Sequence, residues 1–307
     1  MKRLIPLALV AGLLAACGGS ESPDTAGTET PPSPNEVTRT SDGPTVDANV
    51  QAMQTALGGD WRSDAEKARD AFRNPAETLQ FFGIDADDTV IEIWPGGGWY
   101  SNILAPYLAS GDGQLIAAHW DPAAFEGDRR ARIQDRIDSY MARYAARAET
   151  FGQPQLSAFS AQSGPLAEAG SADAVLTFRN VHNWMGGDYT AKFFTDAYAA
   201  LKPGGVLGVV EHRLPSSAEQ DPRGASGYVH EDFVKSLAAA AGFEFAGASD
   251  INANPNDTAD HPFGVWTLPP VSRTTDRDGN TPEGFDADAY KAVGESDRMT
   301  LKFVKPA

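Results

Sequence analysis

Cysteine is almost absent from this sequence of 307 residues, in which the only one is Cys17. The chain can therefore form neither an intramolecular disulfide nor a metal site built from several thiolates. Basic residues are also few, because 25 Lys and Arg stand against 42 Asp and Glu and leave a net charge of −17. A surface this acidic repels phosphate backbones, which argues against nucleic-acid binding through a basic patch.

Long hydrophobic runs are also missing. The apolar run near the N-terminus, Leu4 to Leu14, is shorter than the roughly 20 residues that a membrane-spanning helix needs. It follows Lys2 and Arg3 and leads through small residues to Cys17, which is the layout of a signal peptide. The segment Leu14-Ala15-Ala16-Cys17 resembles the bacterial lipobox, in which the chain is cut before the cysteine and the cysteine is acylated.

This resemblance implies an exported bacterial lipoprotein of the cell envelope that reaches the membrane through its lipid anchor only. The second residue of the mature chain would be Gly18 and not Asp, which favours the outer membrane, facing the periplasm. An ordinary signal peptide with an incidental cysteine is the alternative. Residues 18–50 hold almost no large apolar side chains and predict a disordered tether, which leaves 51–307 as the folded domain.

From about residue 60, apolar runs and helical patterns alternate, which predicts an α/β domain with a parallel sheet. A stripe of Ile133, Ile137, Met141 and Tyr144 indicates an amphipathic helix. We expect strands at 89–94, 114–120, 155–159, 174–178, 206–211, 243–248 and 299–304, and helices at 64–82 with a break at Asn74-Pro75, at 130–148, at 189–201 and at 231–241.

Residues 249–290 form a long insertion without clear periodicity, and segments of this length are usually functional or mobile. Within it, Asp276, Asp278 and Asn280 faintly resemble a calcium-binding loop. The glycine falls at the fourth position of that pattern where a calcium loop has it at the sixth, and no glutamate stands at the twelfth. An Asp-Gly turn is therefore the favoured interpretation.

The sharpest motif is a hydrophobic strand that ends in an acid and turns through three glycines, Glu92-Ile93-Trp94-Pro95-Gly96-Gly97-Gly98-Trp99-Tyr100. Glycines let the backbone turn sharply and approach a ligand closely, and the helix that follows presents free N–H groups. The spacing differs from the G-x-G-x-x-G of dinucleotide loops. A tight turn in an unrelated α/β protein is the structural alternative.

The motif is similar to motif I of class I S-adenosylmethionine-dependent methyltransferases, acid-x-G-x-G-x-G. Two further segments match that superfamily in order and spacing, the turn Leu201-Lys202-Pro203-Gly204-Gly205 and the strand start at Ser171–Leu176. More narrowly, the chain resembles a bacterial family of exported "predicted methyltransferases" over roughly residues 60–305. The segments that carry this narrower resemblance are Glu92–Tyr100, Arg73–Thr78, Phe178–Trp184, Val265–Pro270 and Glu295–Leu301.

The resemblance implies a Rossmann-like α/β fold, with helices on both faces of a mostly parallel seven-stranded sheet whose strand 7 is antiparallel. It also implies S-adenosylmethionine as cofactor and a small molecule as substrate. The chain departs from the usual pattern at three places: Trp94 replaces the first glycine, His119 followed by Asp121 stands where an acid ends strand 2, and Ser160 stands where an acid follows strand 3. The expected cofactor-binding residues are Glu92, Trp94, Gly96, Gly97, Gly98, Tyr100, His119, Asp121, Ser160 and Asn180.

Methyl transfer from a sulfonium needs alignment, and a base helps when the acceptor is a hydroxyl or an amine. His182, just past strand 4, is the first choice for the base, with Asn183 and Asn180 orienting the acceptor and Arg179 holding an anionic group. Packing or helix capping is the alternative role of Arg179. Four aromatic side chains could form a wall against adenine or a cation, namely Trp94, Trp99, Tyr100 and Trp184. The alternative role for them is core packing, which we expect more for Trp94 than for Trp184.

Three functions remain open. The first is a methyltransferase with a small-molecule acceptor. The second is a non-catalytic envelope lipoprotein with a degenerate methyltransferase fold, which the export signal favours because S-adenosylmethionine is made in the cytoplasm. The third is a metal-dependent enzyme, because several histidines and acids are expected at the rim of the sheet. Its candidate ligands are Glu92, His119 and His182, with Glu211 or His212. The sequence does not define the oligomeric state.

Overall fold

The structure is a computed structural model that describes residues 46–307. The predicted signal peptide, the lipidation site Cys17 and residues 18–45 of the predicted tether lie outside the described residues. The described chain begins with helix α1 (Val46–Gly58), so the expected domain boundary at residue 51 falls inside a helix. Within this part of the chain, no helix is both long enough and apolar enough to cross a bilayer.

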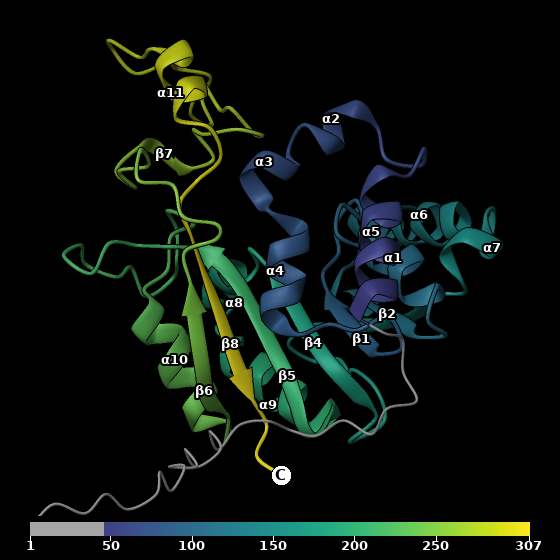
Figure 1. Cartoon of the computed structure of the whole chain (residues 1–307). Coiled ribbons are helices and arrows are strands. Elements are labelled where there is room, and N and C mark those ends of the chain that lie inside the picture. Colours follow the sequence, from purple (N-terminus) through teal and green to yellow (C-terminus); the bar gives the residue numbers. More distant parts are fainter. Residues whose placement is uncertain (1–45) are drawn as a thin grey trace, which may run out of the picture. The chain divides into compact units, whose positions relative to one another are not determined.

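Seven strands form one sheet in the order β3-β2-β1-β4-β5-β8-β6. The pairs from β3 to β5 are parallel, and β8 runs antiparallel to both β5 and β6. The strands are β1 (Thr89–Ile93), β2 (Gln114–Trp120), β3 (Gln155–Phe159), β4 (Ala172–Phe178), β5 (Leu201–His212), β6 (Glu244–Ser249) and β8 (Arg298–Val304). The expected fold class is therefore confirmed, including one antiparallel strand near the edge (Figure 1).

Helices cover both faces of this sheet. Besides α1, they are α2 (Asp64–Lys67), α3 (Asp70–Arg73), α4 (Pro75–Phe82), α5 (Ser101–Ala109), α6 (Gly127–Ala145), α7 (Ala148–Phe151), α8 (Val181–Gly187), α9 (Thr190–Ala200), α10 (Glu231–Ala240) and α11 (Ala287–Val293), with a short 3-10 helix at Pro122–Ala124. The break expected at Asn74-Pro75 is confirmed, because Asn74 takes a left-handed conformation and Pro75 starts α4, and a second break separates α2 from α3.

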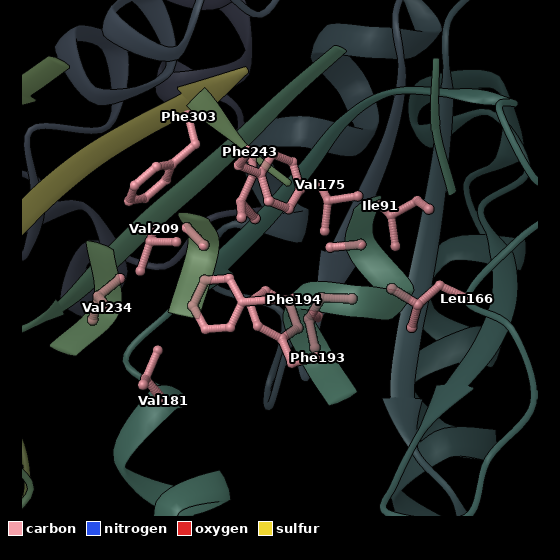
Figure 2. Close-up of a cluster of buried hydrophobic side chains, with 14 of the residues drawn as sticks. Ile91, Leu166, Val175, Val181, Phe193, Phe194, Val209, Val234, Phe243 and Phe303 are labelled. Atoms are coloured by element: carbon pink, nitrogen blue, oxygen red, sulfur yellow. The ribbon is translucent and has the colours of Figure 1, made fainter. Parts of the chain in front are cut away.

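The core is two buried clusters, one on each face of the sheet. Ile91 and Val175 point to the face that α8, α9 and α10 cover, where Phe193 and Phe194 are fully buried (Figure 2). Val90 and Leu176 point to the opposite face, under α1, α4, α5 and α6. Each buried phenylalanine stabilises the fold by about 2–3 kcal/mol. Two hydrophobic layers hold the carboxyl ends of the parallel strands in fixed positions.

The segments outside the sheet gather at one of its ends. Figure 1 shows α2, α3, α11 and strand β7 (Pro262–Val265) at the end where the arrowhead of β5 lies. In the insertion, Asp276 Oδ1 accepts hydrogen bonds from the backbone N–H groups of Asp278 and Asn280, at 2.9 and 2.8 Å. The Asp-Gly turn is thus confirmed, because this carboxylate is satisfied by its own loop.

Candidate active site

A cavity of about 540 Å³ lies at the carboxyl ends of β1 and β4. The strand order reverses here, because the chain adds strands outward from β1 in both directions, and α/β folds place ligands at such points. The volume is within the usual range for small-molecule sites. Its walls come from residues 94–97, 178–183, 265–271 and 295–296, together with side chains from α2, α3 and the segment between them.

The glycine loop presents open backbone to this cavity. Gly96 has a φ of 61°, and a Cβ added at Gly96 or Gly97 would meet no atom within 4 Å. Trp94, which stands at the first glycine position, also takes a left-handed φ of 50°. Its indole N–H donates to the backbone oxygen of Phe159 at 2.9 Å, so side-chain packing holds a conformation that glycine adopts freely.

Glu92 is a buried acid at the base of the cavity. Its side chain is 2% exposed, and Ser101 Oγ donates to Glu92 Oε2 at 2.6 Å. Burial raises the pKa of Glu92 to about 7, against the opposing effects of Ser101 and of the positive charge on Arg179. The site therefore holds a carboxyl group that titrates near neutral pH.

His182 is held by a buried carboxylate. Its Nδ1 lies 3.1 Å from Glu211 Oε1, and Glu211 is fully buried and accepts from the backbone N–H groups of Val181 and His212 at 2.6 and 2.8 Å. A carboxylate in this position assigns the proton to Nδ1 and leaves Nε2 as the basic nitrogen. Burial, followed by the charges on His182 and Arg179, lowers the pKa of His212 well below its ordinary value.

Four arginines surround a single glutamate at one end of the cavity. Arg69 Nε, Arg73 Nε and Arg298 Nη2 lie 2.7, 2.9 and 2.9 Å from the carboxylate of Glu295. Burial alone would raise the pKa of Glu295, but the positive charges of Arg73, Arg298, Arg69 and Arg179 lower it to about 2. Burial and then the charge on Arg179 lower the pKa of Arg73 to about 9.

The structure brings most of the predicted site residues to one cavity. They are Glu92, Trp94, Gly96, Gly97, Tyr100, Arg179, Asn180, His182 and Asn183. Asn180 is itself committed to the fold, because its Nδ2 donates to the backbone oxygen of Ile93 at 3.0 Å. Tyr100 stacks on Phe178 with ring centroids 3.5 Å apart, so both contribute ring edges to the wall.

Four predicted cofactor-binding residues do not line this cavity. A Cβ at Gly98 would lie 2.6 Å from Tyr144 Oη, so this glycine is needed for packing. Asp121 caps the 3-10 helix through the N–H of Ala123 and accepts from Ser160 Oγ at 3.1 Å. These two polar side chains satisfy each other, which leaves no acid at the expected ribose position of the wall.

His119 is the fourth, and it lies on the wrong side of its strand. It is fully buried, its ring packs edge-on to Tyr140 of α6, and burial lowers its pKa to about 4. Successive side chains of a strand point to opposite faces, so the next residue, Trp120, reaches the cavity instead. His119 also drops out of the predicted metal set, since only His182, Glu211 and His212 bring possible ligand atoms together, within 4.8 Å among the described residues.

The prediction for the two tryptophans was also wrong. Trp184 is fully buried in the core, whereas Trp94 is half-buried and lines the cavity. Trp94 packs against Trp120 with ring centroids 5.8 Å apart, and Trp266 of the insertion and Trp99 form further aromatic parts of the wall. The sequence contained a signal for several missed residues, because segments that carry the family resemblance, 73–78, 265–270 and 295–301, contribute to this one site.

Comparisons with known proteins give structural likeness without sequence relatives. No protein-family model matches the chain, and no curated protein matches its sequence. Among solved structures it is similar to the 4+2 cyclase SpnF, with 14% identity over 85% of this chain and 93% of that chain and a TM-score of 0.49. It is similar to the CcbJ methyltransferase from Streptomyces caelestis, with 14% identity over 81% of this chain and 100% of that chain and a TM-score of 0.47. It is also similar to an S-adenosylmethionine-dependent methyltransferase from Aquifex aeolicus, with 14% identity over 60% of this chain and 87% of that chain and a TM-score of 0.42. The fold assignment itself rests on the strand order and strand directions of this sheet.

Proposed function

We propose that this protein is an S-adenosylmethionine-dependent methyltransferase that acts on a small molecule. The observation that carries the proposal is the cavity at the carboxyl ends of β1 and β4, bordered by the open glycine loop and by buried Glu92. The strand order agrees with what the sequence resemblance to class I methyltransferases implies. We also propose that the chain belongs to the exported family that it resembles and is lipid-anchored at Cys17 in the cell envelope.

The residues present fit most parts of the methyl donor. Open space beside Gly96 and Gly97 leaves room for a ligand against the loop. The carboxyl group of Glu92 suits the donor's ammonium group, and the rings of Trp94 and Trp120 suit its adenine. The acid expected near the ribose hydroxyls, Asp121, does not line the cavity, because its carboxylate accepts hydrogen bonds from Ala123 N–H and Ser160 Oγ. We therefore expect weaker binding than an acid at that position would give.

When bound, S-adenosylmethionine supplies an electrophilic methyl group on a sulfonium. The chain itself provides alignment and a base. His182, whose Nδ1–H is held by Glu211, accepts the acceptor's proton at Nε2, and Asn183 in the same wall orients the acceptor. Trp266 and Pro269 of the insertion add an aromatic ring and a proline to the wall of the cavity.

A metal-dependent reaction is less well supported. The possible ligands His182, Glu211 and His212 lie close together, but Glu211 already accepts hydrogen bonds from backbone N–H groups. The positive charges of Arg179 and Arg298 help to lower the pKa of His212, and the same charges would repel a metal cation bound beside it. A non-catalytic ligand-binding protein with the same fold is the outcome if donor binding is observed without methyl transfer.

Calorimetric titration of the purified protein with S-adenosylmethionine and S-adenosylhomocysteine tests the proposal. We expect micromolar to submillimolar binding that falls at least tenfold in Glu92→Ala. Glu77→Ala, a substitution in α4 outside the cavity wall, is the matched control and should bind as the wild type does. No heat of binding at millimolar ligand, or equal binding in both variants, would refute this use of the cavity.

A further inference from the structure

We propose that the arginine end of the cavity binds an anionic group, a carboxylate or a phosphate, of the small molecule that is methylated. That the bound molecule is methylated rests on the proposed function, whereas the anion site itself does not depend on that function. The site consists of Arg69, Arg73, Arg179 and Glu295 in the cavity wall, with Arg298 buried behind them.

The charges at this end of the cavity do not balance. Arg69, Arg73, Arg179 and Arg298 face one carboxylate, Glu295, which leaves an excess of three positive charges, or two if nearby Glu92 is ionised. The third acid of the wall, Glu66, is hydrogen-bonded to the neutral groups of Ser63 and Asn102, and counting its charge as well leaves an excess of two positive charges, or one if Glu92 is ionised. In a chain with a net charge of −17, such a concentration of buried positive charge is what an anionic ligand would neutralise.

Two arginines of the cluster, Arg179 and Arg69, have unused hydrogen-bonding capacity. Nη1 of Arg179 is buried and has no hydrogen-bond partner among residues 46–307, and the same holds for Nη2 of Arg69. Buried donors are normally satisfied, and a guanidinium is suited to bind a carboxylate or phosphate through two parallel hydrogen bonds. Burial, followed by the charge on Arg298, lowers the pKa of Arg179 to about 10, which is the effect expected of cations crowded without enough counter-charge.

The backbone of Arg179 gives an independent indication. This residue has a φ of 63°, a left-handed backbone conformation that residues other than glycine and asparagine rarely adopt. Its backbone N–H donates to the oxygen of Val210 at 2.7 Å, so the neighbouring strand β5 holds this conformation directly after β4. Strained backbone of this kind is enriched at functional sites, which agrees with a role for the position of the Arg179 side chain.

The methyl acceptor is a better source of the anion than the methyl donor. S-adenosylmethionine carries a sulfonium, an ammonium and one carboxylate, so its net charge is positive and an excess of positive charge does not favour it. The proposed base, His182, lies three residues after Arg179 in the same wall. An acceptor held by its anionic group at Arg179 would thus present its nucleophile beside this base.

The test uses inorganic phosphate as the probe, titrated calorimetrically into the protein without any adenosyl ligand. We expect phosphate to bind the wild type and to bind at least tenfold more weakly to Arg179→Gln and to Arg179→Gly. The glycine variant guards against misfolding, because glycine adopts the left-handed conformation without strain. Arg130→Gln removes the same charge from an exposed position of α6 outside the cavity wall and should change the affinity less than twofold.

A second titration separates the two possible sources of the anion. If the acceptor is the anion, S-adenosylhomocysteine should bind both Arg179 variants within threefold of the wild type. A tenfold loss for S-adenosylhomocysteine, with methylthioadenosine (which lacks the carboxylate) unaffected, would assign the arginines to the donor and overturn the inference. It is also overturned if phosphate does not bind, or binds the variants as it binds the wild type. Phosphate binding without S-adenosylhomocysteine binding would refute the methyltransferase and leave the anion site standing.

Discussion

Replacing Glu295 by glutamine should destabilise the protein strongly. This side chain is 5% exposed and is the counter-charge for Arg69, Arg73 and Arg298, at distances of 2.7 to 2.9 Å. Glutamine keeps the shape but leaves the buried guanidinium groups without their anion. Breaking a buried ion pair in this way costs about 3–5 kcal/mol.

The pKa of Glu295 leads to a similar magnitude. A fall from the ordinary value of 4.5 to about 2 corresponds to about 3 kcal/mol of stabilisation of the ionised form. Because the pKa is lowered in the folded state, this stabilisation is present above pH 4.5 and is lost as the pH falls towards 2. The difference between wild type and Glu295→Gln should therefore be largest near pH 7 and shrink below pH 4.5.

Urea denaturation followed by tryptophan fluorescence measures this difference at pH 7 and at pH 3. Asp250→Asn is the matched control, because Asp250 forms an ion pair with Arg213 but its side chain is 83% exposed. Surface pairs of this kind contribute at most about 1 kcal/mol. A loss below about 1 kcal/mol for Glu295→Gln at pH 7, or a difference that does not shrink at pH 3, would show that the arginine cluster does not depend on this carboxylate.

Four further predictions concern Glu92, the glycine loop, His182 and the lipidation site Cys17. Burial raises the pKa of Glu92 to about 7, so the protonated carboxyl group stabilises the fold fully below pH 4.5, and this stabilisation is lost as the pH rises through about 7. Urea titrations between pH 5 and 8 should show that Glu92→Gln removes up to roughly 3 kcal/mol of this pH dependence. Gly98→Ala should cost at least about 1–2 kcal/mol, because φ is 87° and Tyr144 is too close, whereas Gly97→Ala should keep the thermal midpoint and weaken S-adenosylhomocysteine binding. His182→Gln should slow methyl transfer roughly 10²–10⁴-fold in an isotope assay with little change in donor affinity. Cys17→Ala should abolish incorporation of labelled palmitate in a bacterial host, and unchanged labelling would contradict lipidation at this residue.

The sequence predicts the sheet well because each buried strand is a short apolar run between turn residues. The strands expected at 89–94 and 114–120 agree with β1 and β2 to within one residue, and the helix expected at 231–241 agrees equally well with α10. Helix α8 was not predicted, because it has seven residues and its N-cap, Asn180, makes no side-chain capping hydrogen bond. Local periodicity is informative where one element buries one face, and it is weak for a helix of two turns.

The candidate site was predicted only where its residues are close together in the sequence. The strand, acid and glycines of 92–98 form a local pattern, and so do the residues just after β4. The arginine cluster does not, because Arg73 and Glu295 are separated by 222 positions in the sequence and meet only in the folded protein. The wrong assignment of His119 has a different cause, since a shift of one residue along a strand moves a side chain to the other face.

A crystal structure of the protein with S-adenosylhomocysteine tests the central claim most directly. We predict that the ligand lies in the cavity against Gly96 and Gly97, with its ammonium group near the carboxyl group of Glu92 and its adenine between the glycine loop and Trp120. A ligand bound outside this cavity, or a cavity that holds only water at saturating ligand, would contradict it.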